Sequence, residues 1–308
     1  MHGIPFPIRR ALALALTLST VAAPATAATP SRGTAYLSSI GGTLFRASYY
    51  FDGATLTVSS ATPSVATVRG GGAVRLPDHR VVVVGAGNVS LYDPIAHTLE
   101  LASSMTNANT ATFDPDGTRL WVGWKDTPIS EIPLDPFGNG TPHTITGDDS
   151  VATTIAFTPQ NGVFYSTGGD AENGNFGAID LGTFVTTRAC TQCFATSVTY
   201  DSFTGHLILA GIGHASQRDP AAPETEIASR DDSAAGENYL YLLPTGDGHL
   251  VGTRSGSGGL VIIDYSASGR LDDASTVIAF APTPEIGDLS GEAAVESDLI
   301  FPDSFESF

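Results

Sequence analysis

The sequence predicts an all-β protein, a β-propeller of six or seven four-stranded blades. Three observations lead to this prediction. Short runs of β-branched and aromatic residues alternate with turns rich in Gly, Pro and Asp. One strand–turn–strand unit recurs along the chain, and its period is close to the roughly 40 residues of a propeller blade. A β-sandwich is the second choice, because it has similar strands but no reason to repeat one turn at one spacing.

The composition fits a folded β protein and excludes several other classes. The chain has 308 residues, of which 42% are hydrophobic, enough for a sizeable core. Only 15% are charged, and there are 34 Gly and 19 Pro, which argues against a helical bundle or a coiled coil. Lys and Arg number 14 against 32 Asp and Glu, a formal charge of −18. A nucleic-acid partner is therefore not expected, since such proteins carry basic surfaces.

Residues 1–27 have the three parts of a secretory signal peptide. The basic pair Arg9 and Arg10 precedes an apolar run from Ala11 to about Ala23, and an A-x-A pattern ends at Ala27. The apolar run is shorter than the roughly 20 residues that a membrane-spanning helix needs. We therefore expect cleavage near Ala27-Ala28 and export to the periplasm or the medium, without a membrane span.

The repeated unit is an apolar strand, a turn, and a second strand of aromatic and β-branched residues. The clearest copies are Ala111–Gly117 before Leu120–Gly123, Ile155–Gly162 before Val163–Tyr165, and Val198–Gly205 before Leu207–Leu209. The last apolar residue before each turn lies at positions 37, 76, 113, 157, 200 and 243, so the spacings are 39, 37, 44, 43 and 43. We expect the blades over about 34–280, within a single propeller domain at 28–297.

These copies resemble the YVTN-type β-propeller repeat, one of the WD40/YVTN group of repeats. The order is a strand, a turn such as Asp114-Pro115-Asp116-Gly117, a second strand, and then a strand that ends in Asp, such as Val89–Asp93. The resemblance covers roughly 34–280. It implies the propeller fold but no single function, because propellers serve as scaffolds, receptors and enzymes.

The C-terminal tail, 298–308, has a pattern of its own. Its segment Ile300–Glu306 resembles the I-F-x-D-G-F-E ending of exported bacterial proteins, with Ser304 in place of Gly. This resemblance implies a sorting or processing signal. The alternative is a frayed acidic terminus. Apolar residues near the tail, including Val295, could also add one strand to the ring closure.

The two cysteines, Cys190 and Cys193, form a C-x-x-C pair. In an exported chain an even cysteine count favours a disulfide, so we expect a structural bridge between them. A redox pair would need a helix N-terminus beside a βαβ unit, and covalent haem would need a histidine where Phe194 stands. A zinc site would need further ligands nearby.

Other polar residues are interpreted as structural. His79, His206 and His249 fall in or just after the repeated turn and are expected to be exposed. Asp170–Asn175 lacks the spacing of a calcium loop and is expected to be a polar hairpin. Residues 215–237 are expected to form a solvated loop, and Trp121 and Trp124 are expected to pack between blades.

Propeller geometry gives a candidate site. The loops that lead into each innermost strand, together with the loops between second and third strands, build one face of the ring. These residues could converge there, at the mouth of the central channel: Asn107, Asn109, Asp148, Asp149, Glu237 and Asn238. Their oxygen atoms are of the kind that bind calcium or magnesium.

Two functions fit these observations, and a third, a quinone-cofactor or haem dehydrogenase, lacks the tryptophan-rich repeats or haem attachment that it would need. The first is an exported, monomeric, non-catalytic propeller that binds a protein, a glycan or a small ligand through the loop-rich face. The alternative is a lactonase-like hydrolase in which calcium or magnesium polarises a carbonyl group. No nucleophile-elbow, zinc-protease or phosphate-loop motif occurs in the sequence, so we favour the binding function.

Overall fold

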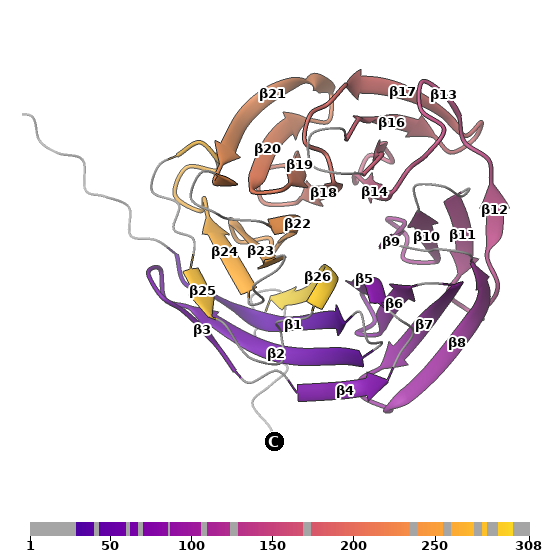
Figure 1. Ribbon diagram of the computed structural model, residues 1–308, viewed down its shortest axis with the longest axis horizontal. Helices are drawn as coiled ribbons and strands as arrows, with labels where there is room; N and C mark the ends of the chain where they lie inside the picture. The colour runs from indigo at the N-terminus through magenta and orange to yellow at the C-terminus, as the bar shows by residue number, and fades with distance from the viewer. Residues whose placement is uncertain are drawn as a thin grey trace, which may run out of the picture.

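The computed structural model confirms the propeller (Figure 1). It describes these residues: 29–39, 43–59, 62–66, 70–85, 87–105, 110–123, 129–168, 174–233, 239–254, 260–273, 279–281 and 289–297. They form six antiparallel sheets whose innermost strands contact one another in a closed ring. Within these residues no helix is long and apolar enough to cross a membrane. The predicted signal peptide and the tail at 298–308 lie outside the described residues.

Each sheet is one blade, and its strands run from the channel outward. Blade 1 contains β26 (Leu289–Ser297), β1 (Ser31–Ser39), β2 (Thr43–Phe51) and β3 (Leu56–Val58), with β4 (Thr62–Ala66) also paired to β2. Blade 2 contains β5 (Gly70–Arg75), β6 (Val81–Gly85), β7 (Gly87–Asp93) and β8 (Thr98–Met105). Blade 3 contains β9 (Thr110–Phe113), β10 (Arg119–Gly123), β11 (Ile129–Pro133) and β12 (Thr141–His143).

The second half of the ring repeats this order. Blade 4 contains β14 (Thr154–Phe157), β15 (Val163–Ser166), β16 (Phe176–Asp180) and β17 (Val185–Cys190), with β13 (Thr146–Gly147) parallel to β17 at the rim. Blade 5 contains β18 (Ser197–Asp201), β19 (His206–Gly211), β20 (His214–Asp219) and β21 (Ala222–Asp231). Blade 6 contains β22 (Tyr239–Pro244), β23 (His249–Arg254), β24 (Leu260–Asp264) and β25 (Ala279–Ala281).

Blade 1 is assembled from both ends of the described chain. Its innermost strand is β26, which pairs antiparallel with β1 from Gly33 opposite Ser297 to Ser39 opposite Leu289. Leu37 therefore lies on the second strand, whereas the repeat residues at 76, 113, 157, 200 and 243 lie at or beside the ends of innermost strands. The first copy is offset because its own innermost strand comes from the end of the sequence.

The core lies between neighbouring blades. Val82 and Val84 of blade 2, for example, pack with Leu120 and Val122 of blade 3, and all four side chains are buried. Small residues allow the blades to approach closely: a Cβ atom on Gly123 would overlap the backbone carbonyl oxygen of Ala152. The apolar strands of the sequence are thus buried by stacking, as the repeat predicts.

The prediction of a loop over residues 215–237 is wrong for most of that segment. It forms a long hairpin of β20 and β21 at the outside of blade 5. Gln217 of β20 is fully buried, and its side chain donates to Gly269 O (2.9 Å) and accepts from Leu271 N (2.9 Å). Gln217 lies in the segment that was predicted to be solvated, but its side chain is buried and forms its hydrogen bonds with the backbone of blade 6.

Candidate functional site

The structure describes only part of the site predicted at the loop-rich face. Asn107, Asn109, Glu237 and Asn238 lie outside the described residues, as does most of Asp170–Asn175. Asp148 and Asp149 lie in the segment between β13 and β14. Within the described residues no group of three or more His, Cys, Asp or Glu side chains could hold a metal ion.

The carboxylate of Asp149 is already occupied by hydrogen bonds within the protein. It accepts from Tyr165 Oη (2.6 Å), from Asn175 Nδ2 (2.9 Å) and from the guanidinium of Arg188 (2.8 and 3.0 Å). Burial alone would raise the pKa of Asp149, but the bonds from Arg188, Tyr165 and Asn175 hold that pKa below its ordinary value. Asp149 therefore ties its loop to blade 4.

The predicted disulfide is absent, because Cys190 and Cys193 are both free thiols. Their sulfur atoms instead contact polar groups. The Arg218 guanidinium lies 3.8 Å from Cys190 Sγ, and Cys193 Sγ lies 3.7 Å from the carbonyl oxygen of Gly174. The pKa of the Cys193 thiol is raised mainly by burial and secondly by a hydrogen bond with Cys190. The pair thus packs between β17 and its neighbours as reduced side chains.

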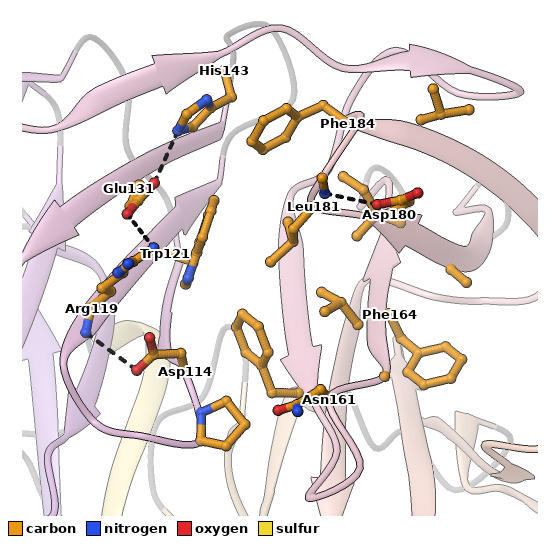
Figure 2. Close-up of a pocket in the computed structure, with 18 of the residues that line it drawn as sticks. Asp114, Arg119, Trp121, Glu131, His143, Asn161, Phe164, Asp180, Leu181 and Phe184 are labelled. Atoms are coloured by element: carbon orange, nitrogen blue, oxygen red, sulfur yellow. Dashed lines mark hydrogen bonds and ion pairs between the residues drawn. The ribbon is translucent and has the colours of Figure 1, made fainter.

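A large cavity lies between blades 3 and 4, with a volume of about 910 Å³ (Figure 2). Its walls come from the turns between first and second strands in both blades, from the turn between β16 and β17, and from the facing strands. Consecutive strands are antiparallel, so these turns lie on the face opposite the loops in which the sequence placed the site. The cavity is therefore a candidate site that the sequence analysis missed.

Aromatic side chains form much of the cavity wall. The ring centroid of Trp121, on β10, lies 6.3 Å from that of Phe157 and 6.4 Å from that of Phe184. Figure 2 shows Trp121 and Leu181 on opposite sides of the cavity, with Phe184 near His143 at one end. Trp121 is only 5% exposed and packs between the two blades, as predicted.

The indole N–H of Trp121 is buried and has no hydrogen-bond acceptor among the described residues. Such a donor costs roughly 1–3 kcal/mol when it is removed from water and left unpaired. Because this nitrogen atom is itself buried, a molecule in the cavity does not reach it in this structure.

A chain of polar side chains lines the rim on the side of blade 3. Arg119 Nη1 lies 2.8 Å from Glu131 Oε1, and Glu131 Oε2 lies 3.2 Å from His143 Nε2 (Figure 2). Below them Asp114 accepts from the backbone N–H groups of Thr118 (2.9 Å) and Arg119 (3.2 Å), which closes the repeated turn. The three strand residues point to one face because β10, β11 and β12 are adjacent and paired.

The lining carries a net negative charge. Among the described residues its carboxylates belong to Asp114, Asp116, Glu131 and Asp180, and its one guanidinium belongs to Arg119. These four negative charges and one positive charge give −3. Cations and neutral molecules are favoured here over anions.

A second cavity, of about 520 Å³, occupies the central channel beside the first. It is lined by the innermost strands of blades 2 to 6, and Phe157 and Pro115 line both cavities. The space between blades 3 and 4 therefore adjoins the channel on the side of the repeated turns.

The sequence indicates that Trp121 packs between blades, but it does not indicate that Trp121 lines a cavity. Arg119, Glu131 and His143 are spaced 12 residues apart and carry no recognisable motif, because strand pairing alone brings them together. His249 was predicted to be exposed and is fully buried instead, because Asp247 and Asp264 flank its ring.

Comparisons with known proteins agree on the fold. No family model and no curated protein matches the sequence. Among solved structures, virginiamycin B lyase from Staphylococcus aureus, an inactive variant with quinupristin, is similar with a TM-score of 0.53 at 12% identity, over 87% of this chain and 92% of that chain. A putative TolB from Agrobacterium tumefaciens has the same TM-score and identity, over 87% of this chain and 98% of that one. At such low identity these similarities show the propeller fold alone.

Proposed function

We propose that the protein is an exported, non-catalytic propeller that binds a ligand in the cavity between blades 3 and 4. The observation that carries this proposal is the cavity itself, whose wall combines the aromatic side chains of Trp121, Phe157 and Phe184 with charged side chains at the rim. The volume of about 910 Å³ lies within the range of roughly 300–1,000 Å³ found for ligand sites.

The polar groups of the wall support binding without catalysis. Glu131 is shared between Arg119 and His143, and Asp114 is bonded to the backbone of its own turn. These groups stabilise one another and shape the cavity. On the predicted loop-rich face Asp149 is similarly engaged, which weighs against the metal-assisted hydrolase.

Calorimetry with defined probes tests the proposal. The probes are neutral sugars, sugar acids, alkylammonium compounds and short peptides, each titrated into the purified protein. We expect saturable binding of one class, abolished by Leu181→Phe, which narrows the cavity. Leu101→Phe is the matched control, because Leu101 is 65% exposed on β8 in blade 2.

Two results would contradict this function. Binding that Leu181→Phe and Leu101→Phe leave equally intact would place the ligand elsewhere. Conversion of a bound probe, seen by NMR of the recovered small molecule, would make the protein an enzyme. Thermal melting of both variants checks that each is folded.

Export is part of the same proposal and rests on the signal-peptide pattern of residues 1–27. We expect the mature protein to begin at Ala28 and to be found in the periplasmic fraction or the medium. Amino-terminal sequencing of each fraction measures this directly. A protein that retains Met1 and stays in the cytosolic fraction would disprove export.

A further inference from the structure

We infer that the cavity between blades 3 and 4 takes the ammonium group of a small organic cation. This inference rests on the proposed binding function and adds the chemical class of the ligand. It is carried by two features that are independent of each other, the arrangement of the aromatic rings and the charge of the lining.

Three aromatic side chains pack together in the wall of the cavity. The centroids of Phe157 and Phe184 lie 6.3 and 6.4 Å from that of Trp121, and their ring planes are tilted from the indole plane by 48° and 42°. At these separations the rings touch one another, so a cation cannot lie between them, but on the cavity side it can lie within about 6 Å of more than one centroid, which is the range of a cation–π contact. Phe157 and Phe184 are half-buried, so neither side chain is fully covered by protein.

The charge of the lining selects for a cation. In the described part of the lining there are four carboxylates and one guanidinium, and that guanidinium, of Arg119, is paired with Glu131 at 2.8 Å. An anionic ligand would have to displace Glu131 from Arg119 and would face the remaining carboxylates. An ammonium group meets carboxylates at the rim and aromatic faces inside, and both attract it.

Choline is a small organic cation that can test this inference, and 3,3-dimethyl-1-butanol has the same shape without the charge. The two compounds therefore separate the effect of the charge from that of the shape.

Isothermal titration with this pair tests the inference. We expect choline to bind saturably and about tenfold more tightly than the neutral alcohol, because only choline can form cation–π contacts. Phe184→Leu keeps an apolar side chain but removes a ring, and should weaken choline binding by about threefold to tenfold. The control is Phe203→Leu, at an exposed phenylalanine in the turn after β18, which should leave the affinity unchanged.

A second pair of variants tests the charge. Glu131→Gln should weaken choline binding more than it weakens binding of the neutral alcohol, while Glu100→Gln, at an exposed residue of β8 in blade 2, should affect neither. Thermal melting shows whether each variant is folded.

The outcomes separate the two proposals. Equal affinity for choline and the alcohol, or binding of neutral sugars in place of choline, would overturn the cation inference and keep the binding function. Failure of every probe class to bind at the cavity would overturn both. Choline binding that survives Leu181→Phe would place a cation site elsewhere and would also overturn this inference.

Discussion

Phe184 stacks face to face on His143, with ring centroids 4.1 Å apart and ring planes 11° apart. Phe184 belongs to the turn between β16 and β17 in blade 4, and His143 ends β12 in blade 3. The stack thus joins the outer parts of two blades that the chain connects only through the segment 144–153. It also sets one end of the cavity.

Loss of this stack should weaken the contact between the blades. We expect Phe184→Ala to lower the free energy of unfolding by about 1–2 kcal/mol, since aromatic pairing and partial burial are both removed. Urea unfolding measures the change. Val185→Ala is the neighbouring control, because Val185 is 41% exposed, and it should cost about 0.5 kcal/mol or less. Equal losses of unfolding free energy in the two variants would show that the stack adds nothing to stability.

Asp149 should contribute far more to stability than the adjacent Asp148. The carboxylate of Asp149 is 9% exposed and accepts hydrogen bonds from three side chains. Asp149→Asn removes it and should lower the free energy of unfolding by about 2–3 kcal/mol at pH 7. Asp148→Asn removes an exposed carboxylate that accepts from the Arg188 backbone N–H (2.9 Å), and should cost about 1 kcal/mol or less.

The effect of Asp149 should depend on pH. Its pKa in the folded protein is lower than the ordinary 3.8, so the stabilisation is complete above that pH and is lost as the pH falls through the folded-state pKa. The stability of Asp149→Asn should therefore approach that of the wild type in acid. A gap that stays constant from pH 7 to pH 3 would contradict this role. A rise in melting temperature with calcium that Asp149→Asn abolishes would instead support a metal site.

His249 should be essential to the junction of blades 6 and 1. Its Nδ1 lies 2.8 Å from Asp247 Oδ1 and its Nε2 lies 3.4 Å from Asp264 Oδ1, while Ser31 Oγ on β1 donates to Asp247 Oδ2 (2.8 Å). His249→Leu would leave two buried carboxylates without their shared partner, at a cost of about 3 kcal/mol or more. Ser31→Ala should cost about 1 kcal/mol.

This junction should also weaken in acid. Burial alone would raise the pKa of Asp247, but hydrogen bonds from His249 and Thr245 lower it below 3.8. The stabilisation is therefore present above that value and is lost below it. Urea unfolding between pH 3 and pH 7 measures the change. A His249→Leu variant as stable as the wild type across this range would disprove the role.

The two cysteines should differ in their reaction with iodoacetamide. The thiolate is the reactive form, and the pKa of the Cys193 thiol is raised by burial and by a hydrogen bond with Cys190. We expect native protein to be alkylated first at Cys190, and unfolded protein to take up two groups without added reductant. Peptide mass spectrometry locates the groups. If the unfolded protein is alkylated at neither cysteine, the two cysteines form a disulfide.

The sequence predicts the fold well because the fold is a repetition of local patterns. The turn at Asp114–Gly117 and its copies at 158–162 and 201–205 each require residues within a few positions of one another, including Gly117 with its positive φ of 65°. Strand alternation and turn chemistry are both local, so the period of the blades is visible without a structure. The offset of Leu37 is not visible in the sequence, because it depends on the pairing of β1 with β26.

The candidate site is much less predictable, because it arises from contacts between blades. Trp121 and Phe184 belong to different blades, and nothing in either segment indicates that they share a cavity. His249 likewise reads as a turn residue, yet its neighbour Asp247 bonds to Ser31, which is 216 positions away. The C-x-x-C spacing suggested a disulfide, but both thiols are free.

The pairing of β26 with β1 fixes the order in which this protein can be completed. Until Leu289–Ser297 has been synthesised and delivered, β1 has one unpaired edge and the ring has a gap beside the channel. A chain that stops before Leu289 would contain five complete blades and an exposed strand edge, the kind of edge that pairs with other chains. Closure is therefore a late event in the life of each molecule, and a premature stop near the end should produce aggregates rather than a slightly shorter protein.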